Sequence, residues 1–187
     1  MAVTGVVLAA GAGTRMGLPK ALVVRDGVPW VARATRLLLE AGCERVVVVL
    51  GASADEARAF VPTDDTVDIV VNDEWSSGVA SSLRVGLAAL AGSATPVDAA
   101  LVTLVDTPGL PVEAVRRVLD SGSPLARAVY DGRPGHPVLI AREHWAAVAA
   151  SVSGDQGARA YLEAHGVTDV ECGDLWNGRD IDTLPTR

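Results

Sequence analysis

Residues 6–20 read Val-Val-Leu-Ala-Ala-Gly-Ala-Gly-Thr-Arg-Met-Gly-Leu-Pro-Lys. The apolar start contains no polar residue, which predicts a strand buried on both faces of a parallel sheet. The glycines that follow allow a loop whose backbone comes close to a ligand. Arg15 and Lys20 add two cations to this loop. Amide donors and cations at the carboxyl end of a strand predict an anion site, best suited to a polyphosphate.

The spacing of this loop excludes two common phosphate-binding patterns. Gly11, Gly13 and Gly17 give G-x-G-x-x-x-G, which is one residue longer than the dinucleotide pattern G-x-G-x-x-G. Lys20 lies between proline and alanine, whereas a Walker A loop needs Gly-Lys-Ser/Thr. The structural alternative is a glycine-rich turn that only reverses the chain.

Composition places the chain in a broad class. Its 187 residues suit a single domain, residues 1–187, with a substantial core. The net charge of −7 argues against nucleic acid or an anionic membrane as a partner, because both need a basic face. No apolar run approaches the roughly 20 residues of a membrane-spanning helix. Cys43 and Cys172 are 129 residues apart and resemble the ordinary thiols of a cytoplasmic protein.

Apolar periodicity predicts strands and helices in alternation, which is typical of a parallel α/β sheet with right-handed crossovers. After the opening strand, further strands are expected at 45–50, 66–71, 98–105, 125–130, 138–140 and 167–171. Helices are expected at 28–40, 53–60, 79–90, 112–119 and 145–150, with a last helix that ends at Gly166. Ser53 is predicted to cap the second helix. The strands on either side of the polar loop 131–137 are expected to form a β-hairpin.

Two further segments, one with Asp106 and one with Gly78 and Ser82, fall at the same sheet edge as the opening loop. Asp106 follows a buried strand, and a carboxylate there is costly unless a cation such as Mg²⁺ compensates it. The alternative is that Asp106 caps the helix beginning near Pro111. Gly78 and Ser82 lie at the start of a helix after another strand, where open parallel sheets bind ligands. Simple capping by Ser81 and Ser82 is the alternative.

Four later residues are candidates for ligand contacts. His136 lies between glycine and proline, so its backbone is restricted, and its pKa is ordinarily near neutral. Arg159 begins a helix and can reach a second anion. Asp180 and Asp182 alternate on an extended segment, so their carboxylates point the same way. One of them could complete a magnesium site with Asp106, although paired carboxylates are also common on solvated faces.

Together these motifs resemble the nucleotidyltransferases with a GT-A-like, Rossmann-type fold. The signature stretch 8–20 carries the resemblance to this superfamily. The segments 78–84, 106–108, 135–137, 154–159 and 180–183 are similar to the molybdenum cofactor cytidylyltransferase branch, also described as MobA-like NTP transferases. The resemblance implies a single-domain three-layer α/β sandwich. Its central sheet is expected to be mostly parallel, with helices on both faces and the small β-hairpin on the acceptor side.

The resemblance also implies a reaction and assigns roles to residues. An acceptor phosphate attacks the α-phosphorus of an NTP, with CTP favoured, and pyrophosphate leaves. Arg15 and Lys20 would neutralise the triphosphate, and Asp106 would carry Mg²⁺ (or Mn²⁺), with Asp182 as the second carboxylate and Asp180 as the alternative. His136 and Arg159 would lie toward the acceptor, expected to be molybdopterin. The nucleotide would be held by Leu8, Ala9, Ala10, Gly11, Gly13, Gly78 and Ser82.

Rival functions remain open at this point. The tail 182–187 departs from the branch pattern Asp-Thr-Pro-Glu-Asp-Leu, which affects the choice between Asp180 and Asp182. One rival keeps the chemistry but uses a sugar phosphate or another small phosphate, with GTP or UTP. The other is a non-catalytic nucleotide-binding protein that assists a molybdoenzyme, or a chaperone of such an enzyme, during maturation.

Overall fold

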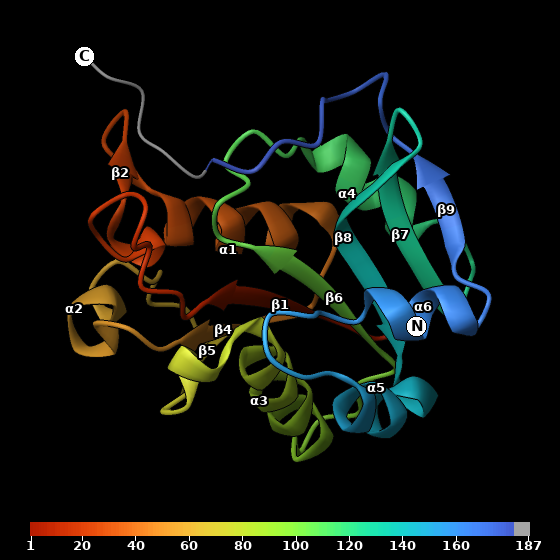
Figure 1. The fold of residues 1–187 in the computed structure, drawn as a ribbon, viewed down its shortest axis with the longest axis horizontal. Coiled ribbons are helices and arrows are strands. Elements are labelled where there is room, and N and C mark those ends of the chain that lie inside the picture. The colour runs from red at the N-terminus through yellow and green to blue at the C-terminus, as the bar shows by residue number, and fades with distance from the viewer. Residues whose placement is uncertain (182–187) are drawn as a thin grey trace.

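In residues 1–181, which the computed structural model describes, seven strands form one sheet in the order β5-β4-β1-β6-β8-β7-β9 (Figure 1). The strands are β1 (Val3–Ala9), β4 (Arg45–Leu50), β5 (Val67–Val71), β6 (Ala99–Leu104), β7 (Leu125–Tyr130), β8 (Arg133–Ala141) and β9 (Thr168–Glu171). β1 is central and pairs in parallel with β4 and β6. All seven of its residues are buried, which confirms the expectation for the opening apolar run.

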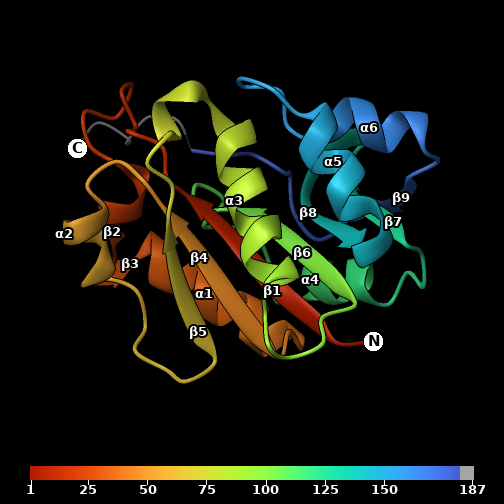
Figure 2. The same ribbon diagram turned by 90° about the horizontal axis from the view of Figure 1, so that it is seen from below.

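Helices cover both faces of this sheet, so the expected three-layer α/β sandwich is confirmed (Figures 1 and 2). The α-helices are α1 (Trp30–Ala41), α2 (Ala54–Arg58), α3 (Val79–Ala91), α4 (Val112–Leu119), α5 (Trp145–Ser151) and α6 (Arg159–Ala164). Helices α1 and α4 pack on one face, and α3, α5 and α6 pack on the other. Short 3-10 helices are η1 (Lys20–Leu22), η2 (Trp75–Ser77) and η3 (Arg142–His144).

The core is made of two apolar clusters separated by the sheet, because neighbouring residues of a strand face opposite sides. On β6, Leu101 packs toward α1 and α4, whereas Val102 packs toward α3 and α5. Gly5 of β1 permits close packing of α1, since a Cβ there would lie 2.7 Å from Leu38 Cδ1. The sheet is therefore packed on both faces, and the ends of its strands are free to hold a site.

The β-hairpin expected near residue 131 is present, but its turn is shorter than predicted. β8 is antiparallel to β6 and β7, and it begins at Arg133, so His136 lies within a strand and not in a loop. Asp131 and Gly132 have φ values of 52° and 73° and make the chain reversal alone. A two-residue Asp-Gly turn with positive φ suits the twist of a hairpin, which explains the early start of β8.

Two other local features differ from the sequence reading. Ser53 has a φ of 54° and its hydroxyl caps nothing at the start of α2, so the predicted cap is wrong. A small hairpin of β2 (Val24–Arg25) and β3 (Val28–Pro29) was not expected, although Asp26-Gly27 between them is a common hairpin turn. None of the helices in the described part of the chain is long and apolar enough to cross a membrane.

Candidate active site

The loop after β1 folds back on itself and forms one wall of a cavity. The amides of Met16 and Gly17 donate to the Gly13 carbonyl oxygen at 2.8 and 3.0 Å. Gly13 has a φ of 59°, and a Cβ there would lie 2.0 Å from the Leu18 carbonyl oxygen. Only glycine therefore allows this close turn. The cavity measures about 650 Å³, within the range of small-molecule sites.

This cavity gathers most of the residues expected to bind the nucleotide. Its lining includes Leu8, Ala10, Gly11, Gly13, Arg15, Lys20, Gly78, Ser82, Asp106 and Asp180. Ala9 is buried on the α1 side of the sheet and does not line it. The carboxyl ends of β1 and β6 and the start of α3 thus meet where a parallel sheet places its ligand.

Asp106 projects from the end of β6 into this cavity, beside the cation of the opening loop. Lys20 Nζ donates to Asp106 Oδ2, and both side chains are largely buried. The capping alternative is wrong, because α4 begins after Pro111 and no side chain caps it. Asp106 Oδ1 is buried and accepts no hydrogen bond from residues 1–181. An unsatisfied carboxylate oxygen is costly in such a place unless a cation or donor reaches it.

The residues around Asp106 fit a hard divalent cation. The Ile181 amide donates to the Asp106 carbonyl oxygen at 2.9 Å, which ties the chain after Arg179 to the end of β6. Asp180, the residue before Ile181, lines the cavity. Within residues 1–181, no group of three histidine, cysteine or acidic side chains is close enough to hold a metal by itself. A Mg²⁺ ion typically uses only one or two carboxylates and completes its shell with substrate phosphates and water. Asp182 lies outside the described residues.

The start of α3 is shaped by contacts that the sequence did not reveal. Gly78 has a φ of 108°, and a Cβ there would lie 2.3 Å from the backbone of Gly154. The Ala80 amide donates to the Gly154 carbonyl oxygen at 3.0 Å. Glycine at position 78 therefore lets the 154–157 loop close over the helix start. The same loop brings Asp155 to the cavity wall.

Asn72, which sequence reasoning missed, holds the serines of this helix. Its Nδ2 donates to Ser81 Oγ at 2.8 Å and to Ser82 Oγ at 3.0 Å, and the three side chains are buried. Its Oδ1 accepts from the Glu74 amide. No side chain caps α3, so simple N-capping by the serines is wrong. The available signal was an asparagine directly after the strand 67–71, at the sheet edge where the other site residues lie.

A second cavity of about 320 Å³ adjoins the first. Leu8, Val79, Leu104 and Asp155 line both cavities. His136 and Arg159, the two residues expected near the acceptor, line the second one. Burial lowers the pKa of His136, while the charges of Asp106 and Asp180 oppose this shift. A neutral imidazole can donate or accept a hydrogen bond at the wall.

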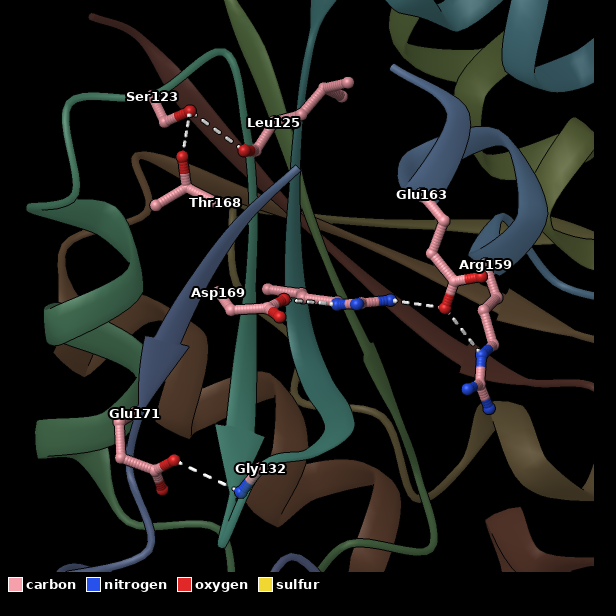
Figure 3. Close-up of polar contacts among 9 residues, drawn as sticks. Ser123, Leu125, Gly132, Arg159, Glu163, Thr168, Asp169 and Glu171 are labelled. Carbon is pink, nitrogen blue, oxygen red and sulfur yellow. Dashed lines mark hydrogen bonds and ion pairs between the residues drawn. The ribbon is translucent and has the colours of Figure 1, made fainter. Parts of the chain in front are cut away.

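Arg127 of β7 also lines the second cavity and was missed by sequence reasoning. Its Nε donates to Asp169 Oδ1 of β9 at 2.6 Å, and its Nη1 lies 3.4 Å from Glu163 Oε1 of α6. Figure 3 shows Asp169, Glu163 and Arg159 along this line of contacts. The hydrogen bond with Asp169 raises the pKa of Arg127. The signal was an arginine inside a strand that is otherwise apolar from residue 125 to 130.

The fold and the cavity define an α/β protein of the nucleotidyltransferase type. The model of the MobA-like NTP transferase domain matches residues 5–170, and the chain belongs to this family. It is 43% identical to the nicotine blue oxidoreductase of Paenarthrobacter nicotinovorans over 97% of this chain and 93% of that protein. It is 33% identical to the molybdenum cofactor guanylyltransferase of Rhodobacter capsulatus, over 79% of this chain and 67% of that protein.

A solved structure supports the same assignment of the fold. Rv0371c from Mycobacterium tuberculosis H37Rv aligns with a TM-score of 0.80 at 28% identity, covering 98% of this chain and 94% of that one. A structure of the same protein in complex with manganese aligns with a TM-score of 0.75 at 26% identity, covering 92% and 89%. The expected class, a MobA-like nucleotidyltransferase fold, is therefore confirmed.

Proposed function

We propose that this protein transfers a nucleoside monophosphate from an NTP to a phosphate acceptor and releases pyrophosphate. The observation that carries the proposal is Asp106, held at the end of β6 beside Lys20 and facing the glycine-loop cavity. A carboxylate that holds a divalent cation and a lysine that contacts phosphates recur together at sites of phosphoryl transfer. The nucleotide occupies the first cavity, and the acceptor occupies the second.

The reaction needs positioning and charge stabilisation more than proton transfer. An oxygen of the acceptor phosphate forms a bond to the α-phosphorus, and the bond between that phosphorus and the bridging oxygen breaks. The pyrophosphate carries away the electron pair. Arg15 and Lys20 neutralise the charge that develops on it. Lys20 carries three N–H donors, so it can keep its contact with Asp106 while it donates to a phosphate.

Mg²⁺, or Mn²⁺, would be held by Asp106 with Asp180 or Asp182, and would polarise the phosphates and reduce their repulsion. The structure of the related Rv0371c with manganese supports a divalent cation in this fold. Arg15 and Lys20, which line the same cavity, then hold the outer phosphates. Ser82, oriented by Asn72, faces the same cavity and is the contact that we assign to the base.

CTP and a molybdopterin-type acceptor remain our specific proposal. The relative from Rhodobacter capsulatus is named for guanylyl transfer to the molybdenum cofactor, which supports the acceptor and makes GTP the rival nucleotide. A molybdoenzyme or its chaperone would then receive the product. Sugar phosphates are less suited to the second cavity, because its walls are mostly apolar.

The deciding experiment measures pyrophosphate release with Mg²⁺, each of CTP, GTP, UTP and ATP, and either molybdenum cofactor or a sugar phosphate. We expect turnover with the molybdenum cofactor and CTP. Asp106→Asn should lower kcat by about 10²- to 10³-fold, in the range for losing one electrostatic contact to a transition state. The exposed Asp65→Asn variant is the matched control and should keep full activity. The absence of pyrophosphate with every pair of substrates would overturn the proposal.

The oxidoreductase relative gives a second candidate function. It is 43% identical over nearly the whole of both chains, and its name describes reduction or oxidation of a coloured compound. A redox step would need an electron donor such as a reduced nicotinamide dinucleotide, whose nucleotide half suits the first cavity. Oxidation of that donor by a coloured acceptor, monitored as a loss of the donor's absorbance, would favour this function. Dye-independent pyrophosphate release would favour nucleotidyl transfer.

A further inference from the structure

The second cavity has one polar feature in its floor that the proposed reaction does not use. Val102 of β6 is opposite Val138 of β8, and Val138 is opposite Arg127 of β7. The floor therefore runs from Leu104, beside the nucleotide cavity, through apolar residues to the guanidinium of Arg127. An acceptor whose phosphate lies at the nucleotide end would place its far end against Arg127.

Arg127 is held in place but retains donors for a ligand. Only 8% of its side chain is exposed. Of its five N–H donors, one bonds to Asp169 at 2.6 Å and one makes the long contact of 3.4 Å to Glu163. Its Nη2 donates to no residue of 1–181, and this atom is not fully buried. Because Arg127 lines the second cavity, a ligand bound there can reach this atom.

The contact with Glu163 is the one that a ligand can replace. Glu163 Oε1 also accepts from Arg159 Nε at 2.9 Å, which is the shorter of its two arginine contacts. Figure 3 shows one Glu163 carboxylate oxygen between Arg159 and the guanidinium group that contacts Asp169. Asp169 keeps its separate bond to Nε. A ligand can therefore take the outer N–H groups of Arg127 without leaving any of these charged groups unpaired.

The charge of this end of the cavity decides the kind of ligand. The positive charges of Arg127 and Arg159 are balanced by Asp169 and Glu163, and Asp155 adds a further carboxylate to the wall. A second anionic group of the acceptor would be buried without a surplus cation, which is unfavourable. A neutral oxygen or ring nitrogen that accepts hydrogen bonds has no such cost. The mostly apolar walls suit a flat ring.

We propose that Arg127 is a specificity-determining residue that recognises a neutral, carbonyl-bearing planar heterocycle at the far end of the acceptor. This inference rests on the proposed function for the orientation of the acceptor. The Arg127 guanidinium donates to the ring carbonyl oxygen and an adjacent ring nitrogen, as arginine does with the acceptor edge of guanine. Sugar phosphates present hydroxyl groups on a puckered ring and lack this planar acceptor edge.

The test is a binding measurement that does not depend on turnover. The probes are 6-hydroxymethylpterin and 2,4-diamino-6-hydroxymethylpteridine, which differ by an exchange of the ring carbonyl for an amino group. The fluorescence of each ring is titrated with protein at neutral pH. We expect the wild type to bind the pterin at least about tenfold more tightly, because the amino group turns an acceptor into a donor facing Arg127.

Substitutions then assign this preference to Arg127. Arg127→Met should reduce the ratio of the two dissociation constants to about one, and Arg127→Lys should lose most of it, because lysine lacks the planar fork. Arg58→Met, at an exposed position on α2, should keep the full ratio. A thermal melt confirms that each variant is folded. If Arg127→Met does not fold, the test is made with Arg127→Lys alone.

Three results would overturn the inference. They are equal binding of the two rings by the wild type, failure to bind either ring, and an undiminished preference in Arg127→Lys or Arg127→Met. The proposed function fails separately, through the absence of pyrophosphate release. A protein that discriminates the two rings through Arg127 but releases no pyrophosphate would refute nucleotidyl transfer and leave the role of Arg127 standing.

Discussion

Gly78→Ala is expected to weaken both folding and nucleotide binding. Gly78 has a φ of 108° and a ψ of 174°, a region that is nearly exclusive to glycine and costs about 1–3 kcal/mol for other residues. The new Cβ would also lie 2.3 Å from the carbonyl group of Gly154. Backbone cannot rotate away as a side chain can, so the 154–157 loop must shift. The hydrogen bond from Ala80 to Gly154, worth about 1 kcal/mol, is then lost as well.

These effects together predict a loss of about 2–4 kcal/mol in the free energy of unfolding. For a chain of this length, each kcal/mol lowers Tm by about 2–4 °C, so a decrease on the order of 10 °C is expected. Calorimetry gives Tm, and urea unfolding gives the free energy. The Kd for an NTP with Mg²⁺ should rise, because Gly78 and Asp155 line the cavity that we propose for the nucleotide.

Alanine substitutions at two other glycines separate the cost of the backbone conformation from the cost of the contact with Gly154. Gly122 has a φ of 67° but no atom near a new Cβ, so Gly122→Ala reports the backbone cost alone, about 1–2 kcal/mol. Gly157 has neither a positive φ nor a close contact, so Gly157→Ala should leave Tm nearly unchanged. If Gly78→Ala is no more destabilising than Gly122→Ala, the reasoning from the Gly154 contact is refuted.

Two further predictions concern buried polar groups. Asn72→Ala should destabilise the fold by about 1–3 kcal/mol and weaken nucleotide binding, because Ser81 and Ser82 lose a buried donor. Urea unfolding and calorimetric titration with an NTP measure the two effects, and the exposed Asn177→Ala is the control; equal losses in both variants would contradict the assignment. Burial raises the pKa of Cys43 to about 12, and it also raises the pKa of the Cys172 thiol. Neither thiol should react with an aromatic disulfide reagent at neutral pH until the protein unfolds. Rapid labelling of the native protein would show that one of these cysteines is accessible.

The sequence by itself determined the architecture and the anchor of the site. Continuous apolar runs such as 46–50 are short and β-branched, which is typical of strands buried on both faces. Their alternation with helical patterns indicates a parallel α/β fold. The glycine loop with Arg15 and Lys20 can be recognised locally, because neighbouring residues supply both its conformational freedom and its charge. Asp106 could be placed from sequence because its strand ends at the same sheet edge as that loop.

Only the tertiary structure decided which distant groups complete the site. Asn72 reaches Ser82 across the start of α3, and Arg127 meets Asp169 and Glu163 across two other elements. These contacts depend on strand register and helix packing, which no local pattern encodes. The Gly78 contact with Gly154 likewise joins residues 76 positions apart. Sequence therefore specified the glycine-rich loop with its two cations, whereas the packing of α3 and α6 on the sheet determined the shape and polarity of the space beside it.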